Sequence, residues 1–391
     1  MPATEYQGSS FLSRSIQSIR RNQVASVLME GKQEQELQHV DIFLKHVGER
    51  FQDLFSFFSG DGEGDDENHS HHHHHHLLLN LPWLRKLLDA FLCCEEEFKA
   101  ILLLYPKASF FSTRLLSDLL DRSLKALDLC NAISIALDSL RRSHDLANLA
   151  LSALRQHPLG PGQFRRAGKA LKTILTTITD KDPTATAERS WSFGRKSKSG
   201  HLQSSVSSTW SAAKQLQAIA GSLAPPRGAE MNGPALSIYT RSSVLVFVMW
   251  VLVAAVPCQD RVGLMTHLPS PPRQLPWAGA MIGLQERIGE EWRKKEKRGT
   301  SGLMEELLRL ETCANKLIEL GESMQFPMDA EKAEELRAQT NELAEICKSM
   351  EDELVAFQRQ VREVFHRIAG SRTEVLDYMS QATRTSSTAV L

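Results

Sequence analysis

The sequence lacks a surplus of charge and the short motifs that mark most catalytic and nucleotide-binding sites. Its 46 Lys and Arg residues balance 47 Asp and Glu residues, and a formal net charge of −1 argues against nucleic acid as a partner. It contains no Gly-rich phosphate loop, no G-x-S-x-G or H-E-x-x-H motif and no zinc-finger spacing of Cys and His. We therefore expect no enzymatic activity, no catalytic residue, no metal site, no cofactor and no small-molecule substrate.

Cysteine and N-terminal apolar residues are also scarce. The six cysteines form no C-x-x-C pair, so we expect reduced, buried thiols in a cytosolic protein. No apolar stretch follows the N-terminus, so a secretory signal is not expected. Residues 1–30 are Ser- and Arg-rich and are expected to be flexible; the alternative is a weak helix that docks on a membrane surface or a partner through Phe11, Leu12, Ile16 and Ile19.

What the sequence does contain is long helical periodicity. Apolar residues recur at steps of three and four over residues 33–58 and over residues 329–369, which predicts two amphipathic helices with a heptad-like seam. In the second helix we expect Asp329 to cap the start and Gly370 to end it. The predicted seam of that helix is Leu336, Thr340, Leu343, Cys347, Met350, Leu354, Phe357, Val361, Val364 and Ile368.

Shorter helices are predicted between these two. Asn80 can cap a helix that carries Pro82 in its first turn and ends before Pro106, and His157-Pro158 ends another. The expected helices are 80–105, 113–156, a basic helix at about 161–179, 204–222, 279–298 and 301–324. The fold class is therefore all-α: an elongated bundle of about seven to nine long helices joined by disordered loops, in which 33–58, 80–105 and 113–156 pack with 301–324 and 329–369.

Composition divides the chain into five parts. A Ser- and Lys-rich linker separates two helical regions, which we expect to form one bundle. The parts are a flexible N-terminus (1–30), an N-terminal helical region (31–179) with a disordered loop (60–79), the linker (180–203), a C-terminal helical region (204–380) and a flexible tail (381–391). The loop contains seven histidines between His69 and His76, which we interpret as low-complexity sequence and not as a metal site, because fixed ligand spacing is absent.

One apolar segment admits three interpretations: a membrane-spanning helix, a buried central helix, or a buried strand, which its Val content allows although no partner strand is visible. Residues 242–259 form an uncharged run of 18 residues, close to the roughly 17 that a membrane-spanning helix needs at minimum. A helix that is apolar on every side can equally form the centre of a bundle, and we favour that interpretation. The residues that would face either core or lipid are Val244, Phe247, Trp250, Val253 and Val256.

The sharpest basic cluster ends the helix predicted at 279–298. Its charges can simply complement the helix dipole in solvent, or they can contact a partner or anionic lipid. The residues are Arg293, Lys294, Lys295, Lys297 and Arg298.

Several segments resemble a plant family, the BYPASS-related proteins, and specifically its Roh type. They include L-P-W-L-R-K-L-L-D-A-F at 81–91, V-F-V-M-W at 246–250 and P-C-Q-D-R at 257–261. Residues 8–24 and 359–368 also look like parts of this family. The histidine run departs from the family's pattern, but it falls in a loop where length variation is expected.

The resemblance implies a function that the residues alone do not reveal. Roh-type proteins are linked to the exocyst, the vesicle-tethering complex at the plasma membrane, through its membrane-binding Exo subunit. This implies a non-enzymatic regulator of polarised secretion of cell-wall polysaccharide, such as seed-coat mucilage, located in the cytosol and peripherally at the plasma membrane. The wider family implies the alternative of a single-pass membrane protein in developmental, root-to-shoot signalling. An enzyme of unseen mechanism is a third class, but the sequence offers no candidate residues for it.

Overall fold

The computed structural model describes residues 37–57, 79–105, 111–179, 210–228, 233–258, 267–296, 302–324 and 328–388. Every regular element in these ranges is a helix, and one isolated parallel bridge joins Leu79 to Met304. After a helix at 37–57, the chain forms α2 (Leu81–Leu104), α3 (Thr113–Leu154), α4 (Pro161–Thr179), α6 (Ala212–Gly221), α7 (Pro234–Ala255), α8 (Ala278–Glu296), α9 (Glu305–Ser323) and α10 (Ala330–Thr388). The predicted all-α elongated bundle is confirmed.

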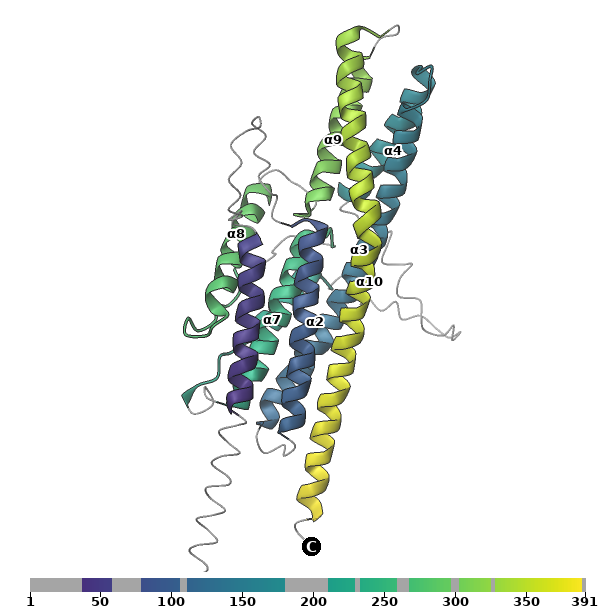
Figure 1. Ribbon diagram of the computed structural model, residues 1–391. Helices are drawn as coiled ribbons and strands as arrows, with labels where there is room; N and C mark the ends of the chain where they lie inside the picture. Colours follow the sequence, from purple (N-terminus) through teal and green to yellow (C-terminus); the bar gives the residue numbers. More distant parts are fainter. Residues whose placement is uncertain are drawn as a thin grey trace, which may run out of the picture.

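The helices run close to one common axis and overlap only in part along it (Figure 1). The 59-residue α10 is about 88 Å long at 1.5 Å per residue, and it contacts α2, α3 and α9. In Figure 1 the helix at 37–57, α2, α7 and α8 form a lower body, whereas α4, α9 and the start of α10 form an upper lobe. The molecule is therefore long because its two longest helices, α3 and α10, connect groups of helices at different heights.

Local signals fixed several helix ends as predicted. The Asn80 Oδ1 atom accepts a hydrogen bond from the Trp83 backbone N–H at 2.9 Å, and Pro82 occupies the first turn of α2. Asp329 Oδ1 accepts from the Lys332 N–H at 2.8 Å at the start of α10. The ten residues of the predicted α10 seam are all buried, because a repeat of three and four places them on one face of the helix.

The end of α10 differs from the prediction. The helix passes through Gly370 and reaches Thr388, into the segment 381–391 that we expected to be a flexible tail. Packing explains the difference: Val375 is buried beyond the glycine, and the Tyr378 hydroxyl donates a hydrogen bond to the Tyr105 backbone oxygen at 2.7 Å. These contacts with the end of α2 outweigh the modest cost of a glycine in a helix.

The helix at 37–57 also packs differently from the prediction. Its Leu54 backbone oxygen accepts a hydrogen bond from the Trp83 indole of α2, and its Phe51 ring meets the Phe247 ring of α7. Its Phe55 ring lies under the Arg287 guanidinium of α8. In Figure 1, α2 lies between this helix and α10, so it joins the bundle through α2, α7 and α8.

The segment leading into α9 bonds to two distant parts of the chain, and one of these bonds runs from the Glu305 N–H to the Leu79 oxygen, at 3.1 Å. The Leu303 and Met304 N–H groups donate to the Ala254 and Ala255 oxygens at the end of α7, at 3.0 and 3.1 Å. A Cβ added at Gly302 would lie 2.5 Å from the Ala255 oxygen, so the close approach requires glycine. The predicted start of α9 at residue 301 therefore moves to Glu305, because the preceding residues bond to α7.

Candidate interaction surface

The apolar segment predicted from the sequence lies at the centre of the bundle. Every residue of α7 after Pro234 is buried. The Phe247 ring lies 5.3 Å from Phe51, in an edge-on arrangement, and 6.1 Å from Trp250. The predicted residues Val244, Phe247, Trp250, Val253 and Val256 are buried against protein.

Length and composition alone would allow α7 to cross a membrane. Among the described helices it is the one that meets this test, which buried core helices of soluble proteins also meet.

A buried ion pair fixes α7 within the bundle. The Arg241 Nε atom of α7 lies 2.7 Å from Glu95 Oε1 of α2, and both side chains are essentially inaccessible to solvent. A second Arg241 nitrogen donates to the Ser123 hydroxyl of α3 at 3.1 Å. Because an unpaired buried charge is costly, this arrangement holds α2, α3 and α7 in one relative position.

The predicted basic cluster lies at the end of α8. Arg293 and Lys294 are exposed, and both bond within their own helix: Arg293 donates to the Gly289 oxygen, and Lys294 pairs with Glu291 at 2.9 Å. The side chains of Lys295, Lys297 and Arg298 lie outside the described part of the structure. The described contacts are those of a solvated helix end.

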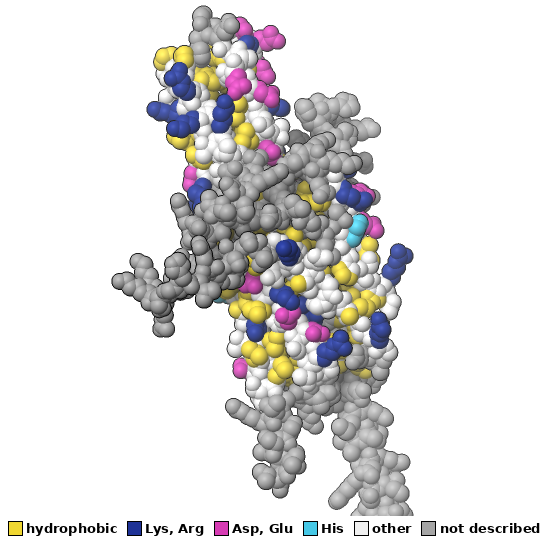
Figure 2. Space-filling view, turned by 180° about the vertical axis from the view of Figure 1, so that it is seen from behind, with side chains coloured by type: hydrophobic (Ala, Val, Ile, Leu, Met, Phe, Trp, Pro, Cys, Tyr) yellow, Lys and Arg dark blue, Asp and Glu magenta, His cyan; other side chains and the backbone are white. Residues whose placement is uncertain are grey.

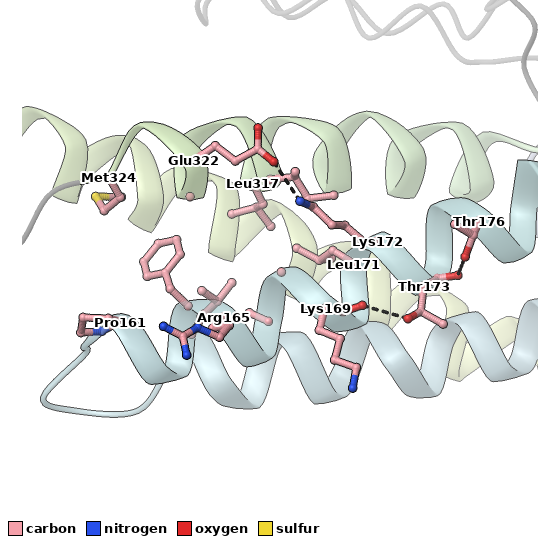
Figure 3. Close-up of a pocket in the computed structure, with 16 residues that line it drawn as sticks. Pro161, Arg165, Lys169, Leu171, Lys172, Thr173, Thr176, Leu317, Glu322 and Met324 are labelled. Carbon is pink, nitrogen blue, oxygen red and sulfur yellow. Dashed lines mark hydrogen bonds and ion pairs between the residues drawn. The ribbon is translucent and has the colours of Figure 1, made fainter.

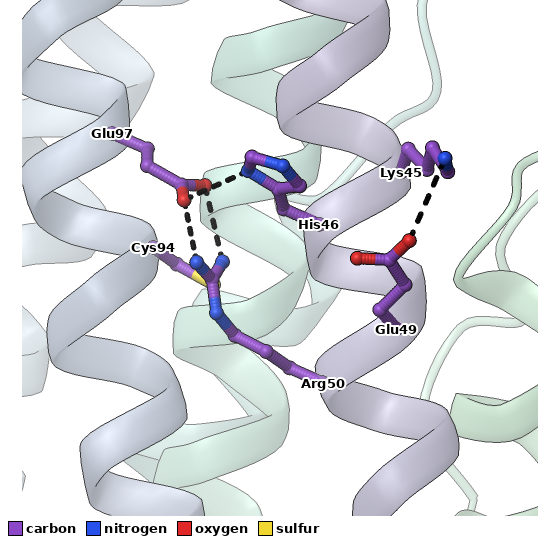
Figure 4. Close-up of polar contacts among 6 residues, drawn as sticks. All are labelled: Lys45, His46, Glu49, Arg50, Cys94 and Glu97. Atoms are coloured by element: carbon purple, nitrogen blue, oxygen red, sulfur yellow. Dashed lines mark hydrogen bonds and ion pairs between the residues drawn. The ribbon is translucent and has the colours of Figure 1, made fainter.

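A second polar cluster joins the helix at 37–57 to α2 (Figure 4). The Arg50 guanidinium binds both oxygens of Glu97, and this hydrogen bonding raises the pKa of Arg50. His46 Nδ1 lies 3.1 Å from Glu97, whereas the Cys94 thiol lies 3.8 Å from Arg50. Burial raises the pKa of Cys94 to about 12, so the thiol stays protonated at neutral pH. The cluster connects two helices and does not activate its cysteine.

Burial has the same effect on three other thiols. It raises the pKa of Cys130 and Cys313 to about 12 and that of Cys347 to about 11. No disulfide joins the six cysteines. Groups of three or more His, Cys, Asp or Glu side chains that could hold a metal are absent from the described ranges, and the predicted loop 60–79 with its histidine run lies outside them, apart from Leu79.

A groove lies between α4 and α9 in the upper lobe (Figure 3). It has a volume of about 640 Å³, and Leu154 at the end of α3 adds to its lining. Its apolar lining comes from helices far apart in the sequence: Leu154, Phe164, Leu171, Leu317, Ile318 and Met324.

The α4 edge of this groove carries positive charge only. The α4 sequence contains four basic residues and no acidic residue, and all four side chains, Arg165, Arg166, Lys169 and Lys172, are exposed. Lys172 reaches across the groove to Glu322 of α9, at 2.8 Å, while Lys169 extends away from α9 in Figure 3. Seen from behind, Lys and Arg side chains gather along one side of the upper lobe, and Asp and Glu along the other (Figure 2).

Comparison with known proteins identifies the family. The family described as "Protein ROH1-like" matches residues 1–379. Protein ROH1A of Arabidopsis thaliana is 44% identical over 420 aligned residues, which cover 100% of both chains. The chain belongs to the ROH1-like family. Protein ROH1D of the same plant is 39% identical over 408 residues, covering 96% of this chain and 98% of the relative. No solved structure matches.

In this ROH1-like chain the predicted site residues do not come together. The α7 residues are in the core, and the described basic residues of α8 are on the surface of the lower body. Sequence reasoning recognised 161–179 as a basic helix but assigned it no site. Two signals pointed to one: basic residues occur there without any acidic residue, and Gly168 leaves one position of the helix without a side chain. The facing wall of α9 could not be found this way, because it comes about 150 residues later in the chain.

Proposed function

We propose that this ROH1-like protein is a non-enzymatic adaptor that binds a helical exocyst subunit of the membrane-binding Exo type. In this role it modulates polarised secretion of cell-wall polysaccharide such as seed-coat mucilage. The proposal takes its partner from the family resemblance. The observation that supports a binding role is the α4–α9 groove, an apolar channel with exposed basic side chains along its α4 edge.

The location proposed with this function is the cytosol, with peripheral association at the plasma membrane. The packing of α7 is compatible with that location, because its residues after Pro234 are already buried by protein. Its one charged residue, Arg241, pairs with Glu95 inside the bundle.

The second candidate function is a single-pass membrane protein in developmental signalling. The length and apolar composition of α7 favour it. To span a bilayer, however, α7 would have to leave the bundle, and Glu95 would then lose the Arg241 guanidinium that neutralises it.

A pulldown with the full-length chain tests the first candidate. The purified chain, kept free of detergent, is incubated with purified exocyst subunits of the Exo type, and a matched chain with Arg241→Glu serves as an unfolding control. Retention of a subunit by the native chain supports the adaptor function. No retention of any Exo-type subunit, combined with membrane association that resists carbonate extraction, would favour the signalling candidate.

A further inference from the structure

The groove in the upper lobe remains open because its walls carry small residues. Leu171 is buried at its base, and Gly168 lies on the α4 wall with nothing within 4 Å of where a Cβ would be. On the opposite wall, a Cβ at Gly321 would lie 3.2 Å from the Phe164 ring, so the glycine lets that ring pack against α9. The space beside Gly168 is wide enough for side chains of another molecule.

The polar edge of the groove favours an acidic occupant. Arg165 and Lys169 have no ion-pair partner among the described residues, and α4 offers no carboxylate of its own. Lys172 is paired with Glu322, but both side chains are more than half exposed. Exposed pairs of this kind contribute little, so an incoming carboxylate can replace Glu322 at small cost.

The shape of the groove favours a partner helix over a lipid bilayer as its occupant. The apolar residues of α4 after Pro161 are buried or, at Phe164 and Leu175, partly buried, and none of the exposed large hydrophobic side chains in the described ranges lies on α4. Little apolar surface is therefore available to insert into lipid. A channel with apolar walls and charged edges instead suits the ridge of side chains that an amphipathic helix presents at every third and fourth residue.

We infer that the α4–α9 groove binds an acidic amphipathic helix of a partner protein, with apolar anchors beside Gly168 and carboxylates against Arg165, Lys169 and Lys172. This inference rests on the proposed adaptor function and names the surface that would perform it. The partner helix lies along α4, its apolar side chains enter the groove, and its carboxylates meet the basic edge of α4.

A designed peptide provides the direct probe. It has about 18 residues, roughly 27 Å as a helix, with Leu at helical spacing of three and four and Glu on the flanks. Its binding to the full-length chain is measured by fluorescence anisotropy at low and high salt. Two control peptides have the same Leu pattern with Lys in place of Glu, and the same composition in scrambled order. We expect the acidic patterned peptide to bind at least about tenfold more tightly than either control, and its binding to weaken with salt.

Matched variants then locate the peptide. Gly168→Phe fills the groove, while Gly162→Phe adds the same ring to the same helix outside it, where a Cβ also meets nothing within 4 Å. We expect Gly168→Phe to weaken peptide binding by about tenfold or more and Gly162→Phe to leave it unchanged. Likewise, Arg165→Glu should weaken binding, whereas Arg166→Glu, beside the groove but not lining it, should change it much less. Thermal melts by circular dichroism check that all four variants fold.

Three outcomes would overturn the inference. The first is equal binding of the acidic and basic peptides, and the second is an equal effect of Gly168→Phe and Gly162→Phe on peptide binding. The third is a preference for vesicles with 30% phosphatidylserine (about one anionic lipid in three) that Arg165→Glu removes and Gly168→Phe does not. The same variants in the exocyst pulldown separate the two proposals. If a subunit binds equally to native and Gly168→Phe chains, the adaptor function stands and the groove is not its docking site. If the peptide binds in the groove but no exocyst subunit is retained, the docking site stands and the proposed partner fails.

Discussion

Helices α7 and α4 are similar in length, at 22 and 19 residues, but they meet their surroundings in opposite ways. Protein surrounds α7 on all sides, and its one charge is neutralised by Glu95 of α2. The α4 helix buries one stripe, Ala167, Leu171 and Ile174, and exposes four uncompensated or weakly compensated cations.

This difference separates a helix that holds the bundle together from a helix with a solvent-exposed face. Side chains of α7 contact α2, α3 and the helix at 37–57, so a change there disturbs several helices at once. Changes on the open face of α4 disturb few contacts and should act on a partner instead. Stability measurements on matched variants of the two helices can therefore confirm or break this contrast.

The largest expected effect is the loss of the α7 ion pair. Arg241→Met leaves Glu95 buried without a partner and should lower the free energy of unfolding by about 3–5 kcal/mol. The double variant Arg241→Met with Glu95→Leu should recover most of this loss, because it removes both charges. Arg165→Met on α4 is the control and should change stability by less than about 0.5 kcal/mol. Urea unfolding followed by circular dichroism measures all three; equal effects of the two single Arg variants would break the contrast.

The next effect depends on pH and concerns Glu306 at the start of α9. Glu306 accepts a hydrogen bond from the Leu81 N–H at 3.0 Å, and burial raises its pKa from 4.5 to about 7. Because the folded state holds this proton more tightly than the unfolded state, the contribution is full below pH 4.5 and is lost as the pH rises through about 7. The free energy of unfolding should fall by at most roughly 3 kcal/mol across that window.

Glu306→Gln isolates this contribution, since glutamine does not titrate. Between pH 5 and pH 8, the unfolding free energy of the native chain should fall relative to that of the variant. A difference that stays constant with pH would show that folding leaves the pKa of Glu306 unchanged and would contradict this prediction.

A smaller effect compares one added methyl group at two glycines. Gly302→Ala forces a contact with the Ala255 oxygen at the end of α7 and should destabilise the protein by about 1–3 kcal/mol. Gly168→Ala, on α4, meets open space and should stabilise it by about 0.5–1 kcal/mol. Thermal or urea unfolding shows whether each substitution raises or lowers the stability. Two substitutions that change the stability in the same direction would contradict the packing described for these sites.

The smallest effect concerns the pair that crosses the groove. A double-mutant cycle on Lys172 and Glu322, each changed to Ala, should give a coupling energy below about 0.5 kcal/mol that decreases in 1 M salt (about a 3 Å Debye length). The same cycle on Arg241 and Glu95 should give a much larger value with little salt dependence. A strong Lys172–Glu322 coupling would mean that the groove is held closed and would weaken the case for docking there.

Much of the fold could be predicted because its signals are local. The buried seam of α10, from Leu336 to Ile368, follows from the spacing of apolar residues, and the start of α2 follows from Asn80 and Pro82. The predicted end at Gly370 was wrong because Val375 and Tyr378 find partners at the end of α2, and no local pattern announces such contacts. The candidate groove was missed for a similar reason, since its walls come from α4 and α9.

By itself, the sequence determined that this protein is helical, where most helices begin, and which face of the longest helix is buried. Those features depend on spacing and capping over a few residues, where the chain fixes the geometry through its own backbone. Only the tertiary structure decided that α7 is enclosed by protein, that Arg241 meets Glu95 and that α4 and α9 leave a groove between them. Each of these depends on residues 100 or more positions apart, and their meeting is set by how whole helices pack.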